Sequence, residues 1–169
     1  MALIAGCSAA SGPGTPPSGP TLPPRPVSAT ADRTPPCRML VADQVERLGL
    51  RHPTPSDAVV DGLPSPACKW LGNDGGISAQ FIPIGAEVAI PVPGAVITQV
   101  NGFGAVRNVP DLPGSPPICQ LAIDVAPGQT VRVQANAIPN PPYGMDELCR
   151  RADEAASMVM TTVVANAPK

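Results

Sequence analysis

Five cysteines and one histidine are the residues of this 169-residue sequence with the most specific chemistry. Cys37, Cys68, Cys119 and Cys149 form an even set, which in an exported protein indicates two disulfides. Three pairings are possible, and we favour the sequential one, Cys37–Cys68 with Cys119–Cys149. Zinc is the competing interpretation, but no two cysteines have CxxC spacing and His52 is the single histidine. These thiols therefore predict a disulfide-bonded domain with no metal and no cofactor.

The fifth cysteine, Cys7, follows a short apolar run over residues 3–6 that ends in Ala-Gly. This order resembles the lipobox of bacterial lipoproteins, in which the signal peptide is cut before the cysteine and the sulfur receives a diacylglyceryl group. The resemblance implies that residues 1–6 are a truncated signal peptide, because six residues are too few for a complete apolar region. It also implies a lipid anchor on Cys7 that holds the protein at the outer face of the cytoplasmic membrane.

Composition excludes several other classes of partner. The net charge is −2 and charged residues are 14% of the chain, so no basic surface is expected to bind nucleic acid. Aromatic residues are 2%, too few for a platform on which bases or sugars stack. No apolar run reaches the roughly 20 residues that a transmembrane helix needs.

Groups that could carry out catalysis are few. His52 would have to be the base of a Ser-His-Asp triad, but no Gly-x-Ser-x-Gly elbow is present, and its proline-rich surroundings indicate a solvated loop. Asp57 and Asp61 could pair as acid and base, although a surface loop explains them as well. We therefore predict that the protein is not an enzyme.

Two aromatic residues are possible ligand contacts. Trp70 lies two positions after Cys68, so packing against a disulfide is the alternative explanation for it. Tyr143 follows two prolines, and packing at the start of a helix explains it equally well. A structure decides between these explanations, because a ligand contact must open onto a pocket.

Proline content divides the chain into a tether and a domain. Residues 8–36 contain nine prolines separated by small residues, and proline removes backbone donors and fixes φ. With Cys7, residues 7–36 are therefore expected to be a disordered, extended tether. The folded domain is expected over residues 37–169.

The domain pattern predicts an α+β fold. Apolar residues at helical spacing indicate a short helix over residues 40–48, and residues 51–66, with four prolines, are expected to be a loop. A long helix is expected over residues 145–165, with an apolar stripe and acidic residues in its first turn. Strands linked by hairpins are predicted between the two helices, with 87–92 the weakest of them: 67–71, 77–82, 87–92, 96–100, 103–109, 118–125 and 130–137. Grouped strands favour an antiparallel sheet with the short N-terminal helix and the long C-terminal helix packed on it.

The order of these motifs resembles the actinobacterial lipoproteins catalogued as domain of unknown function 3558. The matching motifs run from residue 36 to about residue 164, and they are Pro36-Cys37-Arg38-Met39-Leu40, Leu48-Gly49, Cys68-Lys69-Trp70, Asn101-Gly102-Phe103-Gly104-Ala105-Val106, Cys119, the Gly128 hairpin and Cys149. That family has no agreed biochemical function. The resemblance therefore implies a location and a fold rather than an activity.

These observations predict a membrane-anchored, extracytoplasmic lipoprotein that binds an unknown protein or envelope ligand without catalysis. A carrier of apolar envelope lipids, with a cavity between sheet and helices, is the first alternative. A cell-wall hydrolase that depends on His52 or on paired carboxylates is the second.

Overall fold

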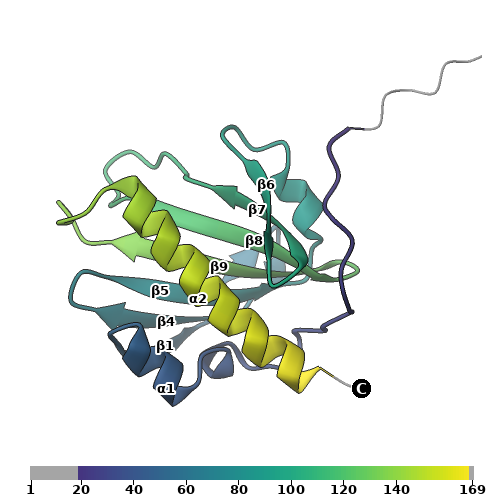
Figure 1. Ribbon diagram of the computed structural model, residues 1–169, viewed down its shortest axis with the longest axis horizontal. Helices are drawn as coiled ribbons and strands as arrows, with labels where there is room; N and C mark the ends of the chain where they lie inside the picture. The colour runs from purple at the N-terminus through teal and green to yellow at the C-terminus, as the bar shows by residue number, and fades with distance from the viewer. Residues whose placement is uncertain (1–18, 168–169) are drawn as a thin grey trace, which may run out of the picture.

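Seven strands form one antiparallel sheet in the computed structural model, which describes residues 19–167 (Figure 1). A separate two-stranded hairpin consists of β2 (Val59–Val60) and β3 (Leu63–Pro64). Across the large sheet the strands follow the order β1 (Leu50–Ser56), β4 (Ala67–Gly72), β5 (Gly75–Ile82), β9 (Gln129–Ala137), β8 (Ile118–Ala126), β7 (Phe103–Asn108) and β6 (Val96–Val100). The predicted α+β class is confirmed.

The long helix α2 (Met145–Asn166) covers one face of this sheet (Figure 1). Residues opposite each other on antiparallel strands point to the same face, and Trp70, Ile77, Ala135 and Cys119 form one such row. The disulfide from Cys119 to α2 shows that this row faces the helix.

Apolar side chains fill the space between the sheet and α2. The predicted apolar stripe of the helix is buried there, with each member at most 2% exposed: Leu148, Ala152, Ala155, Val159 and Val163. Leu121, Ile123, Val131 and Val133 of the two central strands are fully buried against it. This layer is the main core of the domain.

Both disulfides join a helix to a strand. Cys37 lies in the short 3-10 helix η1 (Pro36–Arg38) and is bonded to Cys68 of β4. Cys119 of β8 is bonded to Cys149 of α2. The sequential pairing that we favoured from the sequence is therefore confirmed, as is the short N-terminal helix, α1 (Ala42–Arg47).

Two predicted segments need correction. Residues 51–56, the first part of the expected proline-rich loop, belong to β1 (Leu50–Ser56) at the edge of the sheet. An edge strand tolerates prolines because one side of its backbone needs no partner. Residues 86–89 form the 3-10 helix η2 (Ala86–Ala89) instead of the weak strand predicted over 87–92. Prolines at positions 83, 91 and 93 restrict the ladder hydrogen bonds that a strand would need there.

Residues 19–35, called the N-terminal strap below, lie along the domain (Figure 1, purple). Ala29 and Ala31 of the strap are fully buried, and the N–H of Ala29 donates to the carbonyl of Val125 at 2.8 Å. The prediction that residues 7–36 form one disordered tether is therefore corrected over the strap, where apolar residues gain burial against the sheet. The predicted signal peptide (residues 1–6) and Cys7 lie outside the described residues.

Candidate functional site

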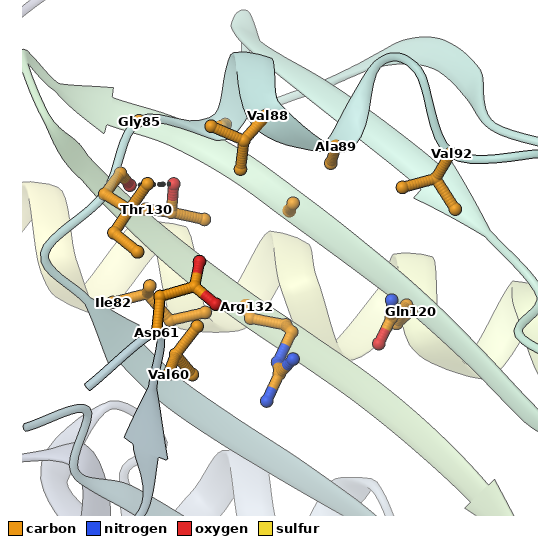
Figure 2. A pocket seen from close by; sticks show the side chains of 13 residues that line it. Val60, Asp61, Ile82, Gly85, Val88, Ala89, Val92, Gln120, Thr130 and Arg132 are labelled. Atoms are coloured by element: carbon orange, nitrogen blue, oxygen red, sulfur yellow. Dashed lines mark hydrogen bonds between the residues drawn. The ribbon is translucent and has the colours of Figure 1, made fainter. Parts of the chain in front are cut away.

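An apolar pocket of about 180 Å³, called the sheet pocket below, opens on the sheet face opposite α2 (Figure 2). Its floor comes from β5, β8 and β9, which contribute Ile82, Ala122 and Arg132 among others. Arg132 lies opposite Gln80 on β5 and Ala122 on β8, in a row that alternates with the helix-facing rows. The floor therefore belongs to the face that the helix leaves open.

Two segments distant in sequence complete the walls of the sheet pocket. Residues 84–92, called the η2 segment below, contain η2 and form one wall. Figure 2 shows Val88, Ala89 and Val92 of this segment along one side, and Val60 with Asp61 of the β2–β3 hairpin along another. The exposed fractions of Val88 and Val92 are 59% and 40%, so apolar surface continues to the mouth of the pocket.

The η2 segment is attached to the sheet by a hydrogen bond. The Thr130 hydroxyl donates to the carbonyl of Ile84 at 2.7 Å, which fixes the chain just before η2 begins (Figure 2, dashed line). Thr130 is itself 3% exposed, so this polar contact lies inside the wall rather than on its surface.

Arg132 is the charged group on the floor. It is half-buried, and its Nη2 donates to Oε1 of Gln80, whose own Nε2 donates to the carbonyl of Ser65 at 2.8 Å. Burial lowers the pKa of the Arg132 guanidinium, although an arginine keeps its charge at neutral pH. The pocket thus combines an apolar lining with one positive charge.

A ladder of polar side chains crosses four strands beside Arg132. Ser78 donates to Gln134 at 3.2 Å, Gln134 to Gln120 at 2.6 Å, and Gln120 to Asn108 at 2.8 Å. Each amide is oriented by its neighbour, so the ladder holds Gln120 in place at the edge of the pocket. Guanidinium and amide groups in this arrangement can bind a polar head group, and no nucleophile is paired with a base among these residues.

Trp70, predicted as a possible ligand contact, is a core residue. Its exposed fraction is 1%, and its row faces α2, on the opposite side of the sheet from the pocket. The alternative explanation from the sequence, packing in the core next to the Cys37–Cys68 disulfide, matches this position.

Tyr143, the second possible contact, lies just before α2. Its hydroxyl donates to the carbonyl of Asp74 in the β4–β5 turn, and the Arg151 guanidinium lies 5.2 Å from the centre of its ring. These contacts orient the start of the helix, and Tyr143 does not line the sheet pocket.

The predicted catalytic candidates are dispersed. His52 is exposed at a bulge of β1 with φ of 45°, and Asp57 is exposed beyond the end of that strand. Asp61 reaches the mouth of the sheet pocket from the β2–β3 turn. Within residues 19–167, no group of three or more His, Cys, Asp or Glu side chains could hold a metal ion.

Arg132 is a site residue that no motif in the sequence identifies. In the sequence it alternates with Val131 and Val133 in a predicted strand, and this period of two predicts that Arg132 lies on a solvated face. The pattern does not show the two segments that cover this face, because their contacts with the sheet join residues well apart in sequence, such as Thr130 with Ile84 and Gln80 with Ser65. The lipid-carrier hypothesis placed a cavity between sheet and helix, where the structure instead has packed side chains.

Comparison with known proteins identifies a family and no individual relative. The family described as "Protein of unknown function (DUF3558)" matches residues 2–162. No curated protein and no solved structure matches the chain. The two disulfides point to an extracytoplasmic protein, because such bonds persist in oxidising compartments. None of the helices in the described part of the chain is both long and apolar enough to cross a membrane.

Proposed function

Since the chain belongs to the DUF3558 family, whose function is unknown, we propose its role from its own cysteines and pocket: a lipid-anchored binding protein of the cell envelope. In this proposal Cys7 carries a diacylglyceryl group, and the domain binds an envelope ligand or protein without catalysing a reaction. The residues before the strap connect the anchor to the domain.

The observation that carries the proposal is the contrast among the five cysteines. Four of them are used within the domain, as Cys37–Cys68 and Cys119–Cys149. Cys7 alone follows a short apolar run that resembles a lipobox. A cysteine with this context is available for lipidation rather than for a bridge within the domain.

A non-catalytic role is supported by the chemistry of the sheet pocket. The polar side chains that line it are the Arg132 guanidinium, the Gln120 amide, the Thr130 hydroxyl, which is bonded to backbone, and the carboxylate of Asp61. Acid–base catalysis needs two groups within reach of the same substrate atoms, and binding needs only complementary charge and shape.

The anchor is tested by metabolic labelling with radioactive palmitate in an actinobacterial host that expresses the full-length precursor. The wild-type protein should carry label and sediment with membranes, while Cys7→Ser should lose both properties. Ser8→Ala, which leaves the cysteine in place, is the matched control and should behave as wild type. Label that persists in Cys7→Ser would contradict the proposal.

A further inference from the structure

The sheet pocket contains a positive charge that the described part of the chain does not neutralise. Within residues 19–167, no carboxylate lies within 4 Å of the Arg132 guanidinium nitrogens. Nη2 is hydrogen-bonded to Gln80, whereas Nε is buried with no partner among the described residues. A half-buried cation without a counter-charge is costly, and an anion bound at the accessible part of the guanidinium would lower that cost.

Two carboxylates stand near the mouth of the pocket. Asp61 is exposed in the β2–β3 turn, and Glu87 is exposed with its carboxylate folded over Gly85. Both face water, where salt screens a charge over roughly 8–10 Å. They therefore leave Arg132 available and disfavour a ligand that carries several negative charges.

The apolar residues that line the pocket determine the size and polarity of the group that fits beside Arg132. Ile82, Ala89 and Ala122 present apolar surface around about 180 Å³ of space. A dry cavity of about 150 Å³ holds a benzene ring, so this space suits an apolar group of about six carbons. A diacyl lipid is too large for it, and inorganic phosphate would leave the apolar lining uncovered.

We propose that the sheet pocket binds a small monocarboxylic acid with an apolar body of about six carbons. Arg132 donates to the ligand carboxylate from its terminal Nη1 in one charge-assisted hydrogen bond, since Nε is buried below the surface and Nη2 is bonded to Gln80. The apolar body lies against Ile82, Ala89 and Ala122. This inference rests on the binding role proposed above and names the ligand class of that site.

The test is a titration of the isotope-labelled 169-residue chain, carrying Cys7→Ser and both disulfides, followed by amide NMR shifts. Hexanoate is the probe, and hexan-1-ol supplies the same chain without the charge. Hexanoate should bind with a dissociation constant on the order of 1 mM and shift amides over residues 82–92 and 120–132. Hexan-1-ol should bind about tenfold more weakly, the value of one charge-assisted pair.

Substitutions in the pocket test its contact with the ligand's carboxylate and its contact with the ligand's apolar body separately. Arg132→Met should reduce hexanoate affinity to that of hexan-1-ol and leave hexan-1-ol unchanged, while Arg47→Met, at an exposed position on α1, should change neither. Ala122→Leu should weaken both ligands by filling the pocket, and the spectrum of each variant reports whether it is folded.

Equal affinities for the two probes, shifts outside the pocket, or unchanged hexanoate binding by a folded Arg132→Met would each overturn the inference. Because the palmitate experiment depends on Cys7 and this titration does not, a failure of the anchor and a failure of the pocket are distinguishable.

Discussion

Arg25 Nε lies 2.9 Å from Asp124 Oδ2, so the N-terminal strap forms an ion pair with a residue almost 100 positions away on β8. The Asp124 side chain is 10% exposed and that of Arg25 is 30% exposed. The pair is therefore largely removed from water, and it places the strap among the structural elements of the domain.

Removing Arg25 should destabilise the domain. Arg25→Met leaves the Asp124 carboxylate buried without its counter-charge, which should lower the free energy of unfolding by about 1–3 kcal/mol. Urea denaturation measures the change, and Arg33→Met, at an exposed position of the same strap, is the control expected to have little effect. The double variant Arg25→Met/Asp124→Asn should recover part of the loss. Additive losses in this double-mutant cycle would show that the two side chains do not interact.

Gly104 should be required for the strap to dock. A Cβ at this position would lie 2.8 Å from the carbonyl oxygen of Pro23 and 3.0 Å from the Cβ of Leu22, closer than such atoms normally approach. Gly104→Ala should therefore cost about 1–3 kcal/mol, as other overpacking substitutions do. In a chain that lacks residues 1–27 the obstacle is absent, and the same substitution should cost nothing. Equal costs in the two backgrounds, measured by urea denaturation, would rule out a clash with the strap.

Local signals in the sequence are sufficient to predict the hairpins and the long helix. Asn101 and Gly102 adopt φ of 50° and 84°, the left-handed conformation that makes Asn-Gly a hairpin signal, and the predicted strand 96–100 is β6 without change. The helix predicted over 145–165 runs from Met145 to Asn166. In these segments the hydrophobic period, the turn residues and the tertiary packing agree, so local reasoning suffices.

The strand β1 and the pocket around Arg132 depend on contacts between segments that are distant in sequence, which local patterns do not encode. The prolines of residues 50–56 suggested a loop, yet an edge position lets them join the sheet as β1. The strand pattern places Arg132 on a solvated face, and the η2 segment with the β2–β3 hairpin makes that face a pocket. A strand pattern identifies which residues share a face, but it does not show what covers that face.

The core role of Trp70 leads to a test with intrinsic fluorescence. Trp70→Ala should lower the free energy of unfolding by about 3–5 kcal/mol, because a fully buried aromatic side chain is lost. As the chain has one tryptophan, its emission reports on this site alone, and saturating hexanoate should leave the wild-type spectrum unchanged. A ligand-dependent shift would return Trp70 to the candidate contacts.

Glu147 and Arg150 at the start of α2 should make stability depend on pH. Arg150 Nε donates to Oε2 of Glu147 at 2.7 Å and its Nη2 to Oε1 at 2.6 Å, and these bonds lower the pKa of the Glu147 carboxyl. A lowered folded-state pKa means that the stabilisation is complete above the unfolded value of about 4.3 and is lost as the pH falls through the folded value. Glu147→Gln should therefore lower the melting temperature at pH 7 and have no effect in strong acid. Glu46→Gln, at an exposed position on α1, is the control for loss of a surface charge.

The two disulfides should contribute almost equally to stability despite their different positions. They join residues 31 and 30 positions apart, so in the chain-entropy model each restricts the unfolded chain by about 3–4 kcal/mol. Cys37→Ala/Cys68→Ala and Cys119→Ala/Cys149→Ala should each lose that amount in urea denaturation under oxidising conditions. With reductant present, the wild-type chain should lose the sum of the two contributions, and each variant should lose only its remaining bridge. If the variant without Cys119–Cys149 lost far more stability than the other, the attachment of α2 to β8 would be the main source of stabilisation, rather than the loop length that the two bridges share.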